Sequence, residues 1–301
     1  MKVIITGSSG QLGKSLNLLK PNKVKIINNN KSNLDLSNEK QISDFIKRNN
    51  PDWVINCGAY TAVDKAEKES DIAFKVNADA TSVISQALLK TNGKLLQIST
   101  DFVFDGNKNR PYTPYEKTAP LGIYGLSKLK GEHNIRKIFS NPNQAVILRT
   151  SWLMSHMGEN FALKILKLHQ ERDSLNIVSD QIGSPTSTLT LAKTCWAIIL
   201  FSGNWSEYYE NKIPILHWSD SGIASWYDVA VAVGEIGLEL GFLKKMADVN
   251  PIKRINYQTL AKRPYFSALD TELTKNFLNL KTIHWRQAML NFLKLLSNLE
   301  Y

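Results

Sequence analysis

The chain has 301 residues, 43% of them hydrophobic, and a formal net charge of +10, enough for one large α/β unit with a smaller lobe. Its two cysteines, Cys57 and Cys195, argue against a disulfide framework, and we expect both to be buried thiols. No apolar run reaches the roughly 18–20 residues that span a bilayer, and the N-terminus has no signal-peptide layout, so we expect a cytoplasmic protein without a membrane partner.

The excess of basic residues is scattered along the chain and contains no basic run interleaved with aromatic residues. Such a distribution is typical of a solvated basic surface, and it could also steer a ligand that carries nucleotide phosphates. We therefore expect no nucleic-acid partner.

Short apolar runs alternate with helix-length segments in the first half of the chain, which predicts a parallel sheet covered on both faces. Five strands with crossovers predict an α/β fold with a Rossmann-like, doubly wound parallel sheet in a dinucleotide-binding domain of residues 1–150. The expected strands are 3–6, 24–27, 52–56, 94–99 and 145–149, and the expected helices are 11–20, 38–48, 71–91 and 125–139.

After residue 150 the elements become shorter, and we expect residues 151–301 to form a smaller C-terminal substrate-binding lobe, some of whose elements can return to the first domain. Ser225 can cap a helix over 226–240, with Asp228 at the capping-box position and Gly241 at the stop. A last amphipathic helix is expected over 282–299.

Three glycines follow the first expected strand directly: Gly7, Gly10 and Gly13. Glycine tolerates the backbone angles of a tight turn, and it lets a pyrophosphate approach the N–H groups and positive dipole of a helix start. Because this Gly-x-x-Gly-x-x-Gly segment follows a strand and opens a helix, it predicts a dinucleotide-phosphate loop.

The end of the second expected strand determines which dinucleotide is preferred. An acidic residue there would bind the ribose 2′-hydroxyl of NAD. Residues 28–32 contain no carboxylate, whereas Lys31 and Ser32 could meet a 2′-phosphate, so the sequence favours NADP and leaves NAD as the alternative. Asp35 and Leu36 follow and could lie on the adenine side of the site.

Tyr124 and Lys128 are four residues apart, which places them on one face of a helix. A nearby ammonium favours the phenolate, so we expect Lys128 to lower the pKa of Tyr124, and it could also bind a cofactor ribose. Ser99 or Thr100, at a strand end, could donate a hydrogen bond to a substrate oxygen. The group predicts hydride transfer to a ketone carbon, with Tyr124 as the proton donor.

These motifs resemble the extended short-chain dehydrogenase/reductases and, within that superfamily, the dTDP-4-dehydrorhamnose reductase family. The resemblance extends over nearly the whole chain. Its more specific parts are Thr-Ala-Val-Asp-Lys-Ala-Glu at 61–67, Ser-Thr-Asp-x-Val-Phe-Asp-Gly at 99–106 and Arg-Thr-Ser-Trp at 149–152. The other matching stretches are 7–13, 56–60, 124–128, 160–161, 180–186 and 263–264.

The resemblance implies reduction of the 4-keto group of dTDP-6-deoxy-L-lyxo-4-hexulose to give dTDP-L-rhamnose, so that a dTDP-sugar is the expected partner. The implied catalytic residues are Thr100, Tyr124 and Lys128, with Asp101 close by. With the glycine loop and Lys31, the expected cofactor site contains Gly7, Gly10, Gln11, Leu12, Gly13, Asp35, Leu36, Cys57, Gly58, Ala59, Ser99, Tyr124 and Lys128. The expected substrate contacts are Thr61, Val63, Thr100, Trp152, Asn160 and Arg263.

Some members of that family are described with magnesium at a glutamate-lined dimer contact. The first helix here contains Lys14 and Ser15 and no glutamate, so the sequence does not support magnesium and we predict no metal site. We expect the protein to be a monomer or a homodimer.

Three other functions can be weighed against the reductase. A 4,6-dehydratase would have an acidic residue directly after Thr100 and Asp101, where this chain has Phe102. A sugar-nucleotide epimerase would use the same tyrosine and lysine and stays open. A non-catalytic regulatory subunit like that of methionine adenosyltransferase also stays open, although Thr100, Tyr124 and Lys128 together favour an enzyme.

Overall fold

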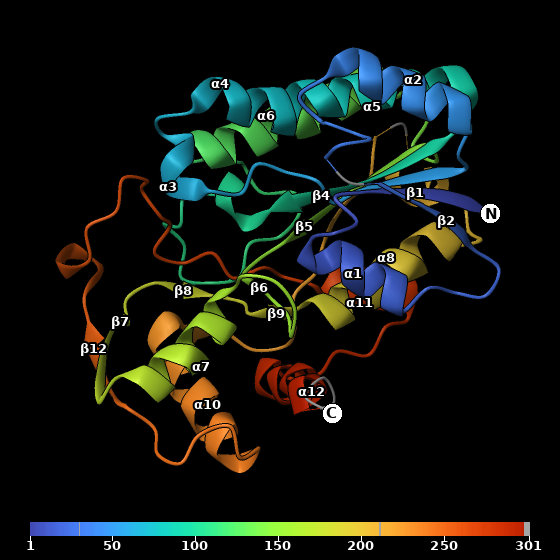
Figure 1. Cartoon of the computed structure of the whole chain (residues 1–301). Coiled ribbons are helices and arrows are strands. Elements are labelled where there is room, and N and C mark those ends of the chain that lie inside the picture. Colours follow the sequence, from blue (N-terminus) through green and yellow to red (C-terminus); the bar gives the residue numbers. More distant parts are fainter. Residues whose placement is uncertain (30, 211, 298–301) are drawn as a thin grey trace.

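A six-stranded parallel sheet lies at the centre of the larger part of the molecule, seen in a computed structural model that describes residues 1–29, 31–210 and 212–297 (Figure 1). The strand order is β10-β5-β4-β3-β1-β2. From β1 the chain adds β2 on one side and then β3, β4, β5 and β10 on the other, and doubly wound sheets bind ligands at the point between β1 and β3 where the side changes. The Rossmann-like prediction is therefore confirmed. The strands are β1 (Lys2–Thr6), β2 (Lys25–Asn28), β3 (Trp53–Asn56), β4 (Lys94–Thr100), β5 (Ala145–Thr150) and β10 (Ile215–His217).

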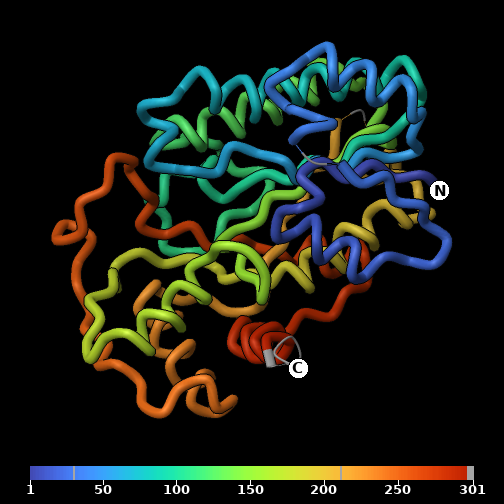
Figure 2. The backbone as a smooth tube through the Cα atoms, viewed as in Figure 1, coloured from blue at the N-terminus to red at the C-terminus, as the bar shows by residue number. Residues whose placement is uncertain are grey.

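Helices cover both faces of the sheet. Successive strand residues point to opposite faces, so Val3 and Ile5 enter the apolar core on one face and Ile4 enters the core on the other. On the first face lie α1 (Gln11–Leu18), α8 (Thr188–Leu200) and α11 (Glu272–Leu278); on the second lie α2 (Glu39–Asn49), α5 (Ala80–Thr91) and α6 (Ile123–Ile138). Segments beyond residue 150 thus contribute β10, α8 and α11 to this part, and Figure 2 shows α8 beside α1.

A smaller lobe packs around its own apolar core, which includes Trp285, Met289 and Phe292. The Ser225 hydroxyl accepts from Asp228 N and the Asp228 carboxylate accepts from Ser225 N, so the predicted capping box is confirmed. The helices are α7 (Phe161–Glu171), α10 (Trp226–Glu239) and α12 (Trp285–Ser297), and α9 (Ser206–Tyr209) is a single turn elsewhere. The strand pairs are β6 (Leu153–Met154) with β9 (Thr186–Ser187), β7 (Ser174–Val178) with β12 (Asp248–Ile252), and β8 (Ile182–Gly183) with β11 (Ala224–Ser225).

Helix α1 ends two residues before its predicted end at 20, and α12 begins three residues after its predicted start at 282. Two other predicted helices differ because of contacts with distant residues. The segment 71–91 contains α4 (Ser70–Phe74), a π turn (Lys75–Asp79) and then α5, because Asn77 in the π turn accepts from Tyr60 N at 2.9 Å and donates to Ser127 Oγ at 2.9 Å. Helix α6 begins at Ile123, two residues early, because the Glu67 carboxylate accepts from Ile123 N.

The last helix, α12, is described to Ser297, and the predicted end at Leu299 lies outside the described residues. Among the described helices, none combines the length and apolar character needed to cross a membrane.

Candidate active site

The glycine loop connects β1 to α1 and packs against the segment that follows β3. Gly7 has φ +62, and its carbonyl accepts from Gly10 N at 2.9 Å. A Cβ on Gly7 would lie 2.9 Å from Gly58 Cα, and one on Gly13 would lie 2.5 Å from Gly7 O. Glycine at these two positions therefore lets the loop pack against neighbouring backbone at the N-terminus of α1, in the strand–turn–helix arrangement that can hold a dinucleotide pyrophosphate.

The segments that follow β2 and β3 meet beside this loop. A Cβ on Gly58 would lie 2.5 Å from Leu36 Cδ1, so Leu36 packs directly on the 57–59 segment. Asp35 accepts from both Ser37 N and Ser37 Oγ at 2.8 Å, and these hydrogen bonds hold its pKa below the usual range. Lys31 and Ser32 are exposed. The structure thus packs Leu36 and Gly58 beside the glycine loop, while the contacts of the predicted cofactor residues with a cofactor stay a prediction.

One of the two thiols differs from expectation. Cys195 is buried, whereas Cys57 is only half-buried as a residue. Burial of the sulfur nonetheless raises the pKa of Cys57 to about 12.

Three buried polar side chains form a series of hydrogen bonds that ends at the backbone of Gly58. Thr6 Oγ1 accepts from Gly58 N at 3.0 Å and donates to Asn56 Oδ1 at 2.5 Å, and Asn56 Nδ2 donates to Gln97 Oε1 at 2.7 Å. These three side chains are buried within strands β1, β3 and β4. Sequence reasoning missed them, although polar residues inside apolar strands were the available signal.

Tyr124 and Thr100 come together where β4 ends and α6 begins. Phe102 packs edge-on against the Tyr124 ring at 5.5 Å, and a hydrogen bond links Tyr124 with Thr100. Burial of the hydroxyl raises the pKa of Tyr124 to about 12, although the Thr100 hydrogen bond opposes the rise. The phenol is therefore protonated at neutral pH.

The expected effect of Lys128 on Tyr124 is wrong for this structure. Lys128 Nζ donates to Ile98 O at 2.6 Å. Burial lowers the pKa of Lys128 to about 8, while Glu132 one turn further along the helix opposes that fall. The ammonium is thus directed at a backbone carbonyl, and the pKa of the phenol rises instead of falling.

Asp101 is buried directly behind Thr100. Thr100 Oγ1 donates to Asp101 Oδ1 at 3.1 Å and accepts from Phe102 N at 3.2 Å. Burial raises the pKa of Asp101 to about 6, although the nearby Ser267 hydroxyl opposes the rise. The second carboxylate oxygen, Oδ2, is buried without a hydrogen-bond partner among the described residues. Asp101 therefore positions the Thr100 hydroxyl.

Ser99 points into a buried ion pair that sequence reasoning missed. Ser99 Oγ donates to Glu132 Oε1 at 2.5 Å, and Arg149 binds the same carboxylate through Nη2 at 2.6 Å and Nε at 2.9 Å. Glu132 lies four residues after Lys128 and eight after Tyr124, so the helical spacing was a usable signal. The predicted contact of Ser99 with a cofactor is untested.

A cleft of about 930 Å³ lies along α7, β7 and the segment 254–265. Arg263 lines it, but its guanidinium binds the Asp64 carboxylate with Nη2–Oδ2 at 2.6 Å and Nη1–Oδ1 at 3.3 Å. Most of the charged side chains that line the cleft are cationic, since Lys164, Arg172, Arg254 and Lys262 line it as well.

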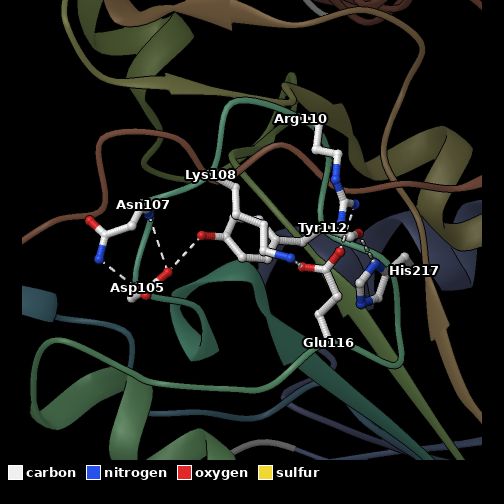
Figure 3. Close-up of polar contacts among 7 residues, drawn as sticks. All are labelled: Asp105, Asn107, Lys108, Arg110, Tyr112, Glu116 and His217. Atoms are coloured by element: carbon white, nitrogen blue, oxygen red, sulfur yellow. Dashed lines mark hydrogen bonds and ion pairs between the residues drawn. The ribbon is translucent and has the colours of Figure 1, made fainter.

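A tightly bonded loop carries the acidic and amide side chains at the rim of this cleft (Figure 3). Asp105 accepts from Tyr112 Oη at 2.7 Å and from Asn107 N at 3.2 Å. A His217 ring nitrogen lies 3.0 Å from Tyr112 O, and Glu116 binds both Lys108 and Arg110. These contacts fix Asp105 and Asn107 beside the cleft.

The remaining predicted substrate residues lie in three places. Trp152 has φ +43 and stacks on Trp226 with ring centroids 3.5 Å apart, so it belongs to an aromatic stack within the lobe. Asn160 caps α7 and contacts Gln11. Thr61 is exposed and Val63 is half-buried where the short helix α3 (Val63–Ala66) begins. Among residues 1–29, 31–210 and 212–297, no group of three or more His, Cys, Asp or Glu side chains is placed to hold a metal ion.

Residues 1–298 match the family described as the RmlD substrate binding domain. The dTDP-4-dehydrorhamnose reductase of Aggregatibacter actinomycetemcomitans is 35% identical over 294 residues, 96% of this chain and 97% of that protein. A solved dTDP-4-dehydrorhamnose reductase from Clostridium acetobutylicum has a TM-score of 0.87 at 33% identity, covering 99% of this chain and 100% of that one. The Bacillus anthracis reductase, solved in complex with NADP, has a TM-score of 0.86 at 32% identity, covering 97% and 98%. Because the family match and the aligned relatives extend over nearly the whole chain, this protein belongs to the RmlD substrate binding domain family.

Proposed function

We propose that this RmlD-family sugar-nucleotide reductase converts dTDP-6-deoxy-L-lyxo-4-hexulose (dTDP-4-dehydro-L-rhamnose) to dTDP-L-rhamnose, with NADPH preferred over NADH. The relatives named above support the substrate and the direction. In this proposal residues 1–150 hold the cofactor and 151–301 hold the sugar nucleotide. The observation that carries the reaction type is the buried Tyr124 phenol beside Thr100, where β4 ends and α6 begins.

Bound NADPH supplies the hydride that reduces C4 of the sugar. Tyr124 gives its phenolic proton to the carbonyl oxygen, so the ketone becomes a carbinol and the phenolate takes up a proton from solvent. Thr100 holds the same oxygen by turning to it the single hydroxyl proton that it gives to Asp101 Oδ1 in the structure. Lys128 binds a ribose hydroxyl of the cofactor, since its ammonium gives one proton to Ile98 O and keeps two further protons to donate.

The glycine loop and the cleft suit the two ligands. The loop ends at the N-terminus of α1, whose backbone N–H groups can bind the cofactor pyrophosphate, and the NADP found in the Bacillus anthracis relative agrees with Lys31 and Ser32 after β2. The cationic side chains of the cleft suit a sugar-linked diphosphate.

The test is an absorbance assay at the nicotinamide band with purified protein, NADPH and the dTDP-4-keto-sugar, and with the product identified by mass. A reductase consumes NADPH stoichiometrically, whereas an epimerase leaves it unchanged. Tyr124→Phe should lower kcat by about 10²–10⁴ and keep NADPH binding. The exposed Tyr208→Phe is the matched control and should leave kcat unchanged. Near wild-type turnover by Tyr124→Phe would remove Tyr124 from the mechanism.

A further inference from the structure

The cofactor loop and the smaller lobe are joined by two hydrogen bonds at one side chain. Gln11, the first residue of α1, donates from Nε2 to Glu159 O at 3.1 Å. Its Oε1 accepts from Asn160 Nδ2, also at 3.1 Å. Donor and acceptor of one amide thus both meet the lobe, which fixes the orientation of Gln11.

The lobe segment is built closely around Gln11. Gly158 has φ +75, and a Cβ placed there would lie 3.1 Å from Gln11 Cγ. Asn160 Nδ2 also donates to Ser155 O at 2.8 Å, which closes the segment into a short loop. A chance surface contact would not combine a left-handed glycine with hydrogen bonds to both ends of the amide.

Asn160 also determines where the wall of the cleft begins. Its Oδ1 accepts from Leu163 N at 3.1 Å and so caps the N-terminus of α7. Phe161, Lys164 and Ile165 in the first turns of α7 line the 930 Å³ cleft. One amide side chain is therefore bonded both to the glycine loop and to the helix that shapes the cleft.

We propose that the Gln11–Asn160 contact couples the two sites, so that the dinucleotide and the sugar nucleotide each bind more tightly when the other is bound. The inference rests on the function proposed above. A dinucleotide on the glycine loop holds α1 with Gln11, and a sugar nucleotide against α7 holds the segment with Asn160, so each ligand favours the arrangement in which the two amides meet. Whichever ligand binds first therefore stabilises the arrangement to which the second binds. Linkage requires the effect to be reciprocal.

The test measures the Kd of NADPH by calorimetry, with and without saturating dTDP-L-rhamnose, a pair that cannot turn over. We expect a ratio of about five to ten between the two Kd values in the wild type. Gln11→Met keeps the length of the side chain and removes both hydrogen bonds. Asn160→Ser keeps a good helix cap and loses the reach to Gln11. Either change should bring the ratio below about two, because a hydrogen bond is worth roughly a two- to tenfold change.

Two comparisons separate coupling from a structural role. The double variant should show the same ratio as either single variant, because each already breaks the shared contact. Gln170→Met is the matched control. Gln170 lies on α7, the helix that Asn160 caps, and its amide donates to Phe242 O at 3.2 Å. It should keep the wild-type ratio. A purely structural role would lower the melting temperature of Asn160→Ser and leave its Kd ratio unchanged.

The outcomes distinguish this inference from the proposed function. Tight binding of each ligand alone with a wild-type ratio of one would overturn the coupling only. The same holds if both single variants keep the wild-type ratio. Failure of NADPH to bind the wild type, or of dTDP-L-rhamnose to bind even when NADPH is present, would refute the proposed function and the coupling with it.

Discussion

Replacing Arg149 with methionine should strongly destabilise the fold. Arg149 and Glu132 are 2% and 1% exposed and are joined by hydrogen bonds of 2.6 and 2.9 Å. The guanidinium also lies 5.2 Å from the centre of the Phe104 ring. Methionine fills much of the same volume but leaves the Glu132 carboxylate buried without its counter-charge.

The size of the effect follows from this burial. Breaking a buried pair from one side costs about 3–5 kcal/mol, because one charge stays desolvated and uncompensated. For chains of 150–250 residues, each kcal/mol lowers Tm by about 2–4 °C, so the expected fall is on the order of 6–20 °C, towards the lower end for 301 residues. Thermal and urea unfolding at pH 7 measure it.

Two further variants test the reasoning. Glu132→Leu combined with Arg149→Met removes both charges and should recover most of the lost stability. Lys245→Met breaks an exposed pair with Asp173 and should leave Tm unchanged. If Arg149→Met unfolds within about 1 kcal/mol of the wild type, then the pair is not desolvated as described.

Three other tests use four further substitutions. Burial raises the pKa of Asp220 to about 7, so its contribution to stability is complete below about pH 4 and is lost as the pH rises through 7; Asp220→Asn should therefore raise Tm relative to the wild type at pH 8 more than at pH 5, and an equal difference at both would contradict this. Arg263→Ala should raise KM for the sugar nucleotide more than it lowers kcat, and Asp64→Asn, which frees the same guanidinium, should lower that KM; unchanged KM in both would make the pair purely structural. Lys31→Ala should lower kcat/KM for NADPH more than for NADH, and equal losses would place Lys31 away from the 2′-phosphate.

The sheet could be predicted because its strands are buried on both faces and appear as uninterrupted apolar runs. All five predicted strands are present, with ends shifted by at most one residue at each terminus. The glycine loop was equally readable, since glycine adopts the φ of +62 found at Gly7 more readily than any other residue. Local sequence decides both features, so no knowledge of distant contacts was needed.

Other parts depend on contacts between distant residues. The π turn exists because Asn77 bridges Tyr60 and Ser127, 17 and 50 residues away. The early start of α6 depends on Glu67, 56 residues before Ile123. A periodicity in one segment contains no information about such partners, so the sequence predicted these helices but not the π turn or the first residue of α6.

The electrostatics of the catalytic group show the same limit most clearly. Spacing placed Tyr124 and Lys128 on one helix face, but it could not show that Lys128 Nζ turns to Ile98 O at 2.6 Å. The consequence suits reduction. With a pKa of about 12, Tyr124 keeps the proton that it must donate, and with a pKa of about 8, Lys128 is charged at neutral pH. Activity should therefore persist across neutral pH and decline above about pH 8 as Lys128 loses its proton, which a kcat/KM profile from pH 6 to 10 measures. A flat profile through pH 10 would show that the charge of Lys128 has no part in the reaction.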